Sequence, residues 1–169
     1  MTYSVRAAVP GDAQALRALH TASWRASYGP FVPADALGAP LDATMQARWG
    51  TWPADRLIRV AERDGAMLGF GAVERGAVPL LDNLHVHPDA RSGGVGASLL
   101  RAICAALAKE GAEALRLIVI AANPRARAFY RKLGGVEAAP VDDTLLGHPV
   151  RMVPVRFSGG DFTALSQEL

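Results

Sequence analysis

A glycine-rich loop between an apolar strand and an apolar helix is the feature that most constrains this sequence. The loop reads Arg91-Ser92-Gly93-Gly94-Val95-Gly96. Pro88 ends the strand before it, because proline removes a donor from the strand ladder. Apolar residues recur after the loop at helical spacing, namely Val95, Leu99, Leu100, Ile103 and Leu107. Glycines at a helix start let backbone amides approach an anion closely, and the helix dipole attracts phosphate. Arg91 adds a charged donor for the same oxygens.

Other glycine motifs fit this loop less well. A P-loop requires a Gly-Lys-Ser/Thr sequence, and no lysine is present here. A dinucleotide-binding fingerprint requires a third glycine where Leu99 stands. A purely structural alternative remains, in which the glycines only allow a helix to pack tightly on a strand.

The order of predicted elements indicates an α/β (α+β) fold, with a mixed sheet and helices on both faces. We predict strands over residues 3–9, 56–62, 67–74, 80–86, 114–120, 136–139 and 150–157, and helices over residues 33–37, 41–52 and 95–110. Asp12 is expected to cap a first helix that ends before residues 28–33, and Asn123 a short helix that reaches Arg131. Asp64-Gly65 is a strong hairpin signal. Residues 158–169 are expected to form a flexible polar tail.

Composition narrows the function classes. A chain of 169 residues fits one domain, here residues 1–169. The net charge of +2, without a basic run, argues against nucleic acid as a partner. Cys104 is the one cysteine, which fits a reducing cytoplasm. Neither a signal-peptide core nor a membrane-spanning apolar run is present, and no spacing suggests a metal site. The sequence predicts a soluble cytoplasmic protein, and its abundant arginine and alanine are typical of a GC-rich bacterial genome.

Two segments carry a resemblance to a known family. Residues 84–96, LHVHPDARSGGVG, followed by Leu99-Leu100, resemble the acyl-CoA signature of the GCN5-related N-acetyltransferase (GNAT) superfamily. Residues 123–134, NPRARAFYRKLG, resemble a second segment of the same family, at the family's order and spacing. The resemblance implies a mostly antiparallel sheet with a splayed central parallel pair, here Leu80–Val86 and Ala114–Ile120. After Gly134 the family usually has a bulky aromatic residue, whereas this chain has Gly135.

The resemblance also implies how acetyl-CoA is held. Backbone groups of residues 84–86 would bind the pantetheine arm and polarise the thioester, and amides of residues 91–96 would bind the pyrophosphate. The implied donor-binding residues are Leu84, His85, Val86, Arg91, Ser92, Gly93, Gly94, Val95, Gly96, Asn123, Arg125 and Phe129. Asn123 has a second explanation that requires no ligand, namely capping of the helix that follows it.

Tyr130 is the predicted general acid, which protonates the departing thiolate of CoA. A phenol with a pKa of about 10 remains protonated at neutral pH. The alternative is that Phe129 and Tyr130 form an aromatic core pair.

Asp82 is the predicted general base, and His85 is the second candidate because its ordinary pKa of about 6.5 suits the task. In a regular strand Asp82 shares a face with Leu84 and Val86, while His85 points to the opposite face. A bulge in this strand would reverse that assignment. A surface or supporting role for Asp82 is the alternative.

Trp24 and Tyr28 belong to a polar-aromatic cluster in the first helix that is expected to contact the acceptor, although ordinary core packing also explains them. The predicted function is transfer of an acetyl group to a primary amine, of a small molecule in preference to a peptide, by direct attack through a tetrahedral intermediate. A non-catalytic acyl-CoA-binding module, a protein N-acetyltransferase and a different acyl donor are the alternatives. Homodimers are common on this fold, and no interface can be read from the chain.

Overall fold

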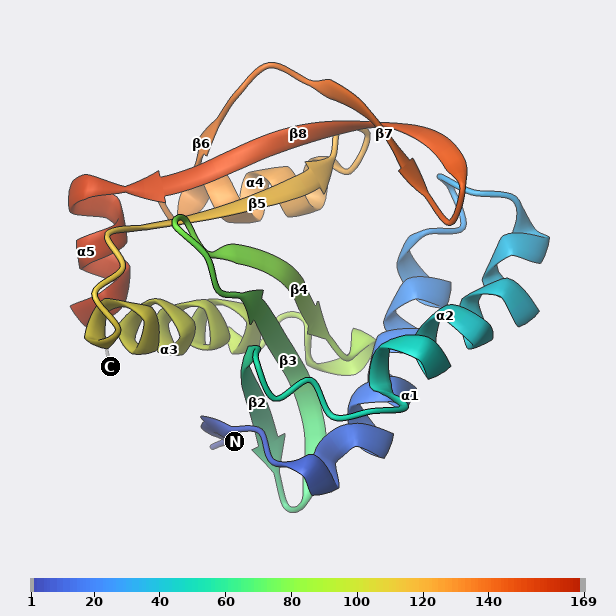
Figure 1. Cartoon of the computed structure of the whole chain (residues 1–169), viewed down its shortest axis with the longest axis horizontal. Coiled ribbons are helices and arrows are strands. Elements are labelled where there is room, and N and C mark those ends of the chain that lie inside the picture. The colour runs from blue at the N-terminus through green and yellow to red at the C-terminus, as the bar shows by residue number, and fades with distance from the viewer. Residues whose placement is uncertain (1, 168–169) are drawn as a thin grey trace.

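In the computed structural model, which describes residues 2–167, eight strands form one mixed sheet (Figure 1). The strands are β1 (Ser4–Ala7), β2 (Leu57–Arg63), β3 (Ala66–Glu74), β4 (Leu80–Val86), β5 (Ala114–Ile120), β6 (Val136–Glu137), β7 (Val141–Leu145) and β8 (His148–Ser158). They are ordered β1-β2-β3-β4-β5-β8-β6, with β7 paired to β8. The helices are α1 (Ala13–Ser27), α2 (Ala39–Trp49), α3 (Val95–Lys109), α4 (Pro124–Lys132) and α5 (Gly159–Gln167), with 3-10 turns at Pro10–Asp12, Ala34–Leu37 and Pro88–Ala90. The predicted fold class is confirmed.

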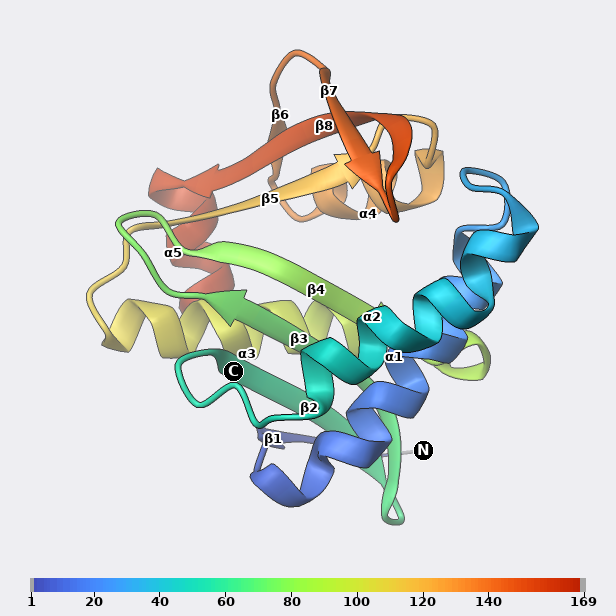
Figure 2. The same ribbon diagram turned by 45° about the vertical axis from the view of Figure 1, so that its right-hand side comes forward.

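Helices cover both faces of the sheet (Figure 2). On one face α1 and α2 bury Leu16 and Met45 against strand residues such as Phe70. On the other face α3 and α5 bury Ile103 and Phe162 against the middle of the sheet. No helix within residues 2–167 is long and apolar enough to cross a bilayer.

The parallel strands β4 and β5 diverge from each other. Their pairing is limited to Leu80 opposite Arg116, at the start of both strands. By contrast, β5 pairs with β8 over its whole length. Figure 1 shows the gap widening toward the C-terminal ends of β4 and β5. The predicted splay is confirmed.

Two hairpins turn through residues with positive φ. The predicted turn at Asp64-Gly65 is confirmed, with φ of 52° and 78°, as a type I′ turn requires. A second hairpin at Leu146-Gly147, with φ of 50° and 78°, joins β7 to β8. The sequence did not predict this turn or β7, because leucine is unfavourable in the left-handed region. Packing of Leu146 against two apolar clusters offsets that strain.

The expected flexible tail is wrong for residues 159–167, which form α5. Phe162 and Leu165 of this helix are buried against α3 and the sheet. The sequence of this segment does not indicate a helix, because two consecutive glycines and several polar residues surround the apolar pair Phe162 and Leu165. Tertiary packing therefore forms a helix that local propensity does not predict.

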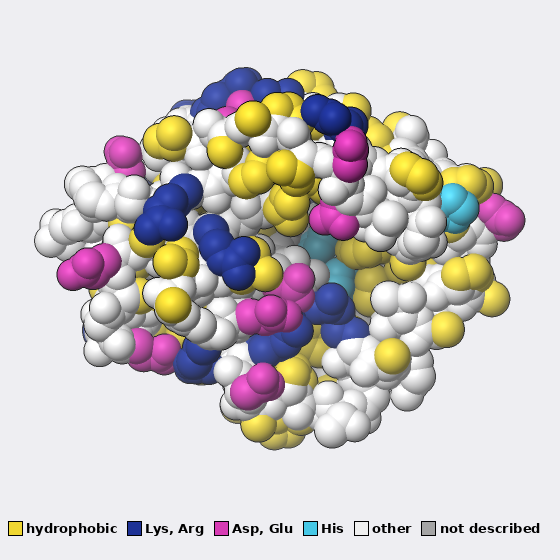
Figure 3. Space-filling model, turned by 45° about the horizontal axis from the view of Figure 1, so that its top comes forward, with side chains coloured by type: hydrophobic (Ala, Val, Ile, Leu, Met, Phe, Trp, Pro, Cys, Tyr) yellow, Lys and Arg dark blue, Asp and Glu magenta, His cyan; other side chains and the backbone are white. Residues whose placement is uncertain are grey.

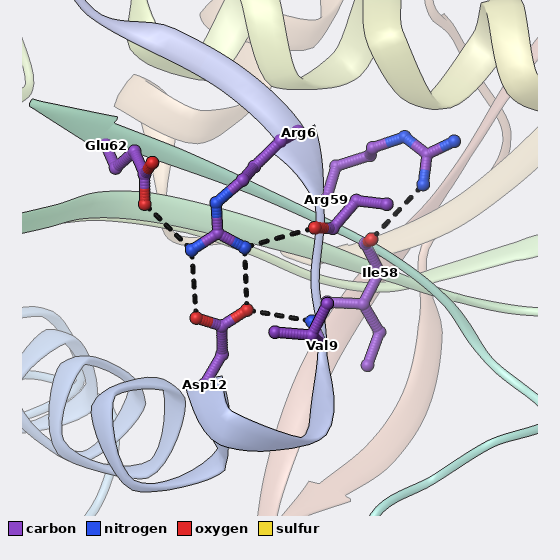
Figure 4. Close-up of polar contacts among 7 residues, drawn as sticks. Arg6, Val9, Asp12, Ile58, Arg59 and Glu62 are labelled. Carbon is purple, nitrogen blue, oxygen red and sulfur yellow. Dashed lines mark hydrogen bonds and ion pairs between the residues drawn. The ribbon is translucent and has the colours of Figure 1, made fainter. Parts of the chain in front are cut away.

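Asp12 stands at the predicted N-cap position of α1, but its side chain makes no hydrogen bond to the helix amides, which corrects the expected cap. Its carboxylate instead accepts two hydrogen bonds from Arg6, at 2.8 and 3.0 Å, and one from the Val9 amide at 2.8 Å (Figure 4). Arg6 also donates to Glu62 of β2. The hydrogen bond with Arg6 lowers the pKa of Asp12 from its usual value. These contacts tie the turn before α1 to the first two strands.

Candidate active site

A cleft of about 680 Å³ opens where β4 and β5 separate. It is bordered by α1, by the starts of α3 and α4, and by the β7–β8 hairpin. The molecule is hollowed on the face seen in Figure 3, where histidine side chains lie at the bottom of the hollow beside basic and acidic groups. Most of the site residues predicted from the sequence line this cleft, namely Tyr28, Asp82, Leu84, His85, Val86, Arg91, Gly94, Gly96, Asn123, Arg125, Phe129 and Tyr130. Four do not line it: Trp24, Ser92, Gly93 and Val95.

The glycine loop brings the start of α3 to one side of the cleft. Gly94 precedes the first helical residue and has φ of +75°, which residues with a Cβ rarely adopt. A Cβ on Gly96 would lie 3.4 Å from the ring of Phe129, so α3 and α4 approach closely here. Val95 points into the core and is 2% exposed. The loop therefore presents the free amides of a helix start to the cleft without intervening side chains.

Arg91 lies between the loop, α1 and the end of β4. Its Nη2 donates to Oγ of Ser27 at 2.9 Å, and its Nε donates to the Val86 carbonyl at 3.3 Å. Burial, and next the charge of Arg125, lower its pKa from the usual value, although it remains a cation. Arg91 and Arg125 together make this end of the cleft basic.

The inner edge of β4 has free backbone groups. The His87 amide donates to the Leu68 carbonyl of β3 at 2.7 Å. Because successive residues of a strand alternate the direction of their backbone groups, the amides of Leu84 and Val86 point away from β3, toward β5. The splay leaves those two amides without a strand partner, at the wall of the cleft.

Tyr130 extends from α4 to the cleft. Its ring packs edge-on against Phe129, with centroids 5.1 Å apart. Burial, and next the proximity of Tyr28, raise the pKa of Tyr130 above its usual value. Its phenol therefore stays protonated well above neutral pH. The two rings form the aromatic pair that the alternative interpretation expected, and Tyr130 also lines the cleft, so its role as general acid stays a prediction.

Asn123 caps α4, as expected. Its Oδ1 accepts a hydrogen bond from the Ala126 amide at 3.1 Å. The residue also lines the cleft, where its Nδ2 is a free donor among the described residues.

Asp82 lies in a bulge of β4. Leu81 is opposite Val73 and Asn83 is opposite Ala72, which leaves Asp82 as an additional residue in β4. Its carboxylate is directed to α2, whereas Leu84 packs on the α3 face. Of the two alternatives that the sequence left open, the structure shows the bulge, which places Asp82 and His85 on the same side of the sheet.

Two arginines engage the Asp82 carboxylate. Its Oδ2 lies 2.5 Å from Nη1 of Arg48 and 2.6 Å from Nη1 of Arg56, and it accepts from Nδ2 of Asn83 at 3.0 Å. Burial acts to raise the pKa of Asp82, but the hydrogen bonds and charges of Arg48 and Arg56 outweigh it, and the net pKa is lowered. This carboxylate is a weak proton acceptor at neutral pH.

His85 belongs to a hydrogen-bonded cluster beneath α1. Its Nδ1 lies 2.9 Å from Oγ of Ser23, and its ring centroid lies 4.6 Å from that of His20. Burial, and next the charges of Arg48 and Arg91, lower the pKa of His85 to about 3. His85 is therefore neutral at pH 7.

His20 is fully buried and neutral. Nε1 of Trp49 donates to its Nδ1 at 3.1 Å, so the ring proton of His20 is on Nε2. Burial lowers the pKa of His20 to about 2, with the neighbouring His85 as the next cause. Nε2 of His20 and Nε1 of Trp24 are buried without a hydrogen-bond partner among the described residues.

The residues predicted to select the acceptor are only partly at the cleft. Tyr28 lines it, and burial raises the pKa of Tyr28 to about 12. Trp24 packs behind it, with ring centroids 4.8 Å apart, between two apolar clusters. Trp24 is therefore packed as core, as the alternative interpretation expected.

Comparison of the sequence with models of protein families identifies the family to which this fold and cleft belong. The model of the Acetyltransferase (GNAT) family matches residues 14–135, which run from α1 to the turn after α4 and include both motifs. The chain belongs to the GNAT family. A search of curated protein sequences finds no significant match to this GNAT protein.

Solved structures share the fold of this GNAT protein. A GCN5-related N-acetyltransferase from Rhodopseudomonas palustris is 23% identical with a TM-score of 0.75, over 94% of this chain and 97% of that one. PaiA N-acetyltransferase from Thermoplasma acidophilum, in complex with coenzyme A, is 19% identical with a TM-score of 0.75, over 94% and 100% of the two chains. A ribosomal-protein-alanine N-acetyltransferase from Brucella melitensis is 20% identical with a TM-score of 0.72, over 92% and 99%.

The departure from the family motif at Gly135 has a structural reason. A Cβ there would lie 2.8 Å from Val155, 2.9 Å from the Tyr130 carbonyl and 3.0 Å from Phe157. No side chain fits, because Phe157 and Val155 of β8 fill the space. In this GNAT protein, Val155 and Phe157 of β8 therefore provide the packing next to Gly135.

Sequence reasoning missed Arg48 and Arg56. They lie 34 and 26 residues before Asp82 and belong to no motif. A partly buried carboxylate in a bulge is stabilised by cationic partners, but the sequence does not show which arginines the fold brings there. Ser23 and His20 lie on the predicted helix, but their contact with His85 also depends on the fold.

Proposed function

We propose that this protein is an acetyl-CoA-dependent N-acetyltransferase that acetylates a primary amine by direct attack. The observation that carries the proposal is one cleft in which a strand gap, a glycine helix start and the partly buried Tyr130 meet. Each of these parts matches one requirement of the reaction, namely a slot for an extended thioester arm, an anion site and a proton donor.

Acetyl-CoA fits the residues that form the cleft. The start of α3, where Gly94 and Gly96 carry no side chains and Arg91 and Arg125 lie nearby, suits the pyrophosphate. The amides of Leu84 and Val86 would hydrogen bond with the pantetheine arm and polarise the thioester carbonyl. The Nδ2 of Asn123 is a further donor for the arm.

Tyr130 is the proposed general acid. As the carbon–sulfur bond breaks, its phenol gives a proton to the departing thiolate, and burial keeps that phenol protonated until then. Phe129 fixes the ring by edge-on packing.

Among the described residues, the cleft contains no strong general base to remove the proton from the amine. Asp82 was the first candidate for general base, but its charge is compensated by two arginines. We assign it the role of holding Arg48 and Arg56 at the acceptor side. His85 is neutral and lines the cleft, and we propose that it orients the incoming amine through a hydrogen bond.

The acceptor would enter beneath α1, where Tyr28 and Phe31 form an aromatic wall. Of the described residues, Asp82 is the one acidic residue that lines the cleft, so the cleft does not resemble an acidic docking surface for a basic peptide, and we favour a small molecule. A peptide amine is the second candidate, since one structure of the same fold is a ribosomal-protein-alanine N-acetyltransferase.

Thiol release from acetyl-CoA across a panel of amines tests the proposal, in parallel with calorimetric binding of CoA. Turnover that is lost in Tyr130→Phe while CoA binding persists would support it. Tight CoA binding without turnover of any amine would favour a non-catalytic acyl-CoA-binding module. Absence of CoA binding at saturating concentration would refute both.

A further inference from the structure

The acceptor side of the cleft carries no free carboxylate among the described residues. Asp82 is the one acidic residue that lines the cleft, against four basic side chains. Its Oδ2 is already shared by Arg48, Arg56 and Asn83. Two guanidinium groups already pair with this carboxylate, so an ammonium group that enters here meets no uncompensated negative charge, although Oδ1 of Asp82 can still accept a hydrogen bond.

The groups around His85 also disfavour a positively charged acceptor. His20 faces its ring from α1, Arg48 acts on it from α2, Arg91 from the glycine loop and Asp82 from β4. Two of these four are cations, one is a neutral histidine, and the one anion is compensated. A proton taken from an ammonium acceptor would have to be held on His85 beside those cations, which the low pKa of His85 disfavours.

Apolar side chains form much of the remaining surface of the acceptor side. Phe31, Ile120, Leu145 and Met152 line it, and the last three also belong to one buried cluster with Val32. Such a wall binds the hydrocarbon body of a substrate by removing it from water.

We propose that the acceptor is a weakly basic amine, uncharged at neutral pH, with an apolar or aromatic body. This inference rests on the proposed N-acetyltransferase function and narrows its substrate class. The neutral amine forms the carbon–nitrogen bond, the carbon–sulfur bond breaks, and Tyr130 protonates the sulfur. The proton lost from nitrogen passes to water, and the Tyr130 phenolate regains a proton from water, so no strong base is required.

Benzylamine and phenylhydrazine are suitable probes, because they are nearly equal in size and the first is a much stronger base. Consumption of the acetyl-CoA thioester, followed by its ultraviolet absorbance, gives kcat/KM for each probe between pH 6 and pH 8. For benzylamine we expect kcat/KM to rise about tenfold per pH unit, in proportion to its neutral fraction. For phenylhydrazine we expect a flat profile and a higher kcat/KM at pH 7.

Variants separate charge from structure. Arg48→Gln removes one cation facing His85, so we expect the benzylamine to phenylhydrazine ratio of kcat/KM at pH 7 to rise several-fold. Arg48→Lys keeps the charge and should keep the ratio. Arg75→Gln breaks an exposed ion pair with Glu110, remote from the cleft, and should also keep it. Circular dichroism and CoA affinity verify that each variant is folded.

Benzylamine turnover at pH 7 that equals phenylhydrazine turnover, or an inflection near neutral pH shared by both probes, would overturn the inference and leave the N-acetyltransferase function intact. No turnover of either probe, with CoA bound and another amine of the panel acetylated, would overturn the inference alone; no turnover of any amine would overturn both. The wild-type pH profiles decide the question even where Arg48→Gln does not fold.

Discussion

Oδ2 of Asp82 lies 2.5 Å from Nη1 of Arg48, so that one ion pair joins the bulge of β4 to the end of α2. Arg56 contacts the same oxygen from the segment before β2. The cluster therefore links three parts of the chain on the acceptor side of the cleft.

Asp82→Asn should lower the free energy of unfolding by about 1–3 kcal/mol at pH 7, because two partly buried arginines lose their charged acceptor. The pKa of Asp82 is lowered in the folded protein, so its stabilisation is complete above the usual aspartate pKa and is lost as pH falls through the folded value. Urea unfolding between pH 7 and pH 3 measures this. A difference between variant and wild type that does not shrink with acidity would contradict the assignment.

Tyr130→Phe should reduce kcat roughly 100-fold or more, since it removes the proposed proton donor while retaining the ring packing. CoA affinity should change little. Steady-state kinetics and calorimetry measure the two quantities. Tyr3→Phe is the matched control, because its hydroxyl bonds to Ser98 outside the cleft. Equal kcat values for Tyr130→Phe and wild type would remove Tyr130 from the mechanism.

Gly94→Ala should cost about 1–2 kcal/mol of stability, because an L-residue is strained at its φ of +75°. Relaxation of that strain would displace the amides at the start of α3, so CoA binding should weaken as well. Gly76→Ala is the control, since a Cβ there meets no atom within 4 Å and φ is not positive. Denaturant unfolding and calorimetry give the comparison. Unchanged stability of Gly94→Ala would argue against the described loop geometry.

His20 should make the protein sensitive to acid. Its pKa is lowered to about 2, so below the usual histidine pKa the unfolded chain binds a proton that the folded chain does not. Stability should therefore fall by about 1.4 kcal/mol per pH unit below about pH 6 from this residue alone. His20→Gln keeps an acceptor for Trp49 and should reduce that slope by one proton. Identical slopes for variant and wild type between pH 6 and pH 4 would exclude the effect.

The sequence predicts the donor side of the site better than the acceptor side. Residues 91–96 and 123–134 are continuous segments, and their glycines and cap have local causes that can be read directly. The cluster of Arg48, Arg56 and Asp82 is assembled from separate segments, and no local signal specifies it. The bulge at Asp82 likewise depends on register against β3, which hydrophobic alternation does not reveal.

In the fold, too, elements with local sequence signals are predicted better than elements that depend on distant contacts. The hairpin at Asp64-Gly65 follows from residues that favour positive φ, whereas the hairpin at Leu146-Gly147 depends on the packing of the partly buried Leu146. α5 is stabilised by contacts of Phe162 and Leu165 with α3 and the sheet. In both cases the energy comes from distant parts of the chain.

The single pairing of Leu80 with Arg116 has a consequence for hydrogen exchange. The amide of His85 belongs to the strand ladder with β3. The amides of Leu84 and Val86 point to the gap, where they must donate to water or to bound acetyl-CoA. In the free protein these two amides should exchange with deuterated solvent faster than the amide of His85. Binding of CoA should slow them selectively, because protection there requires a partner that the sheet itself does not supply.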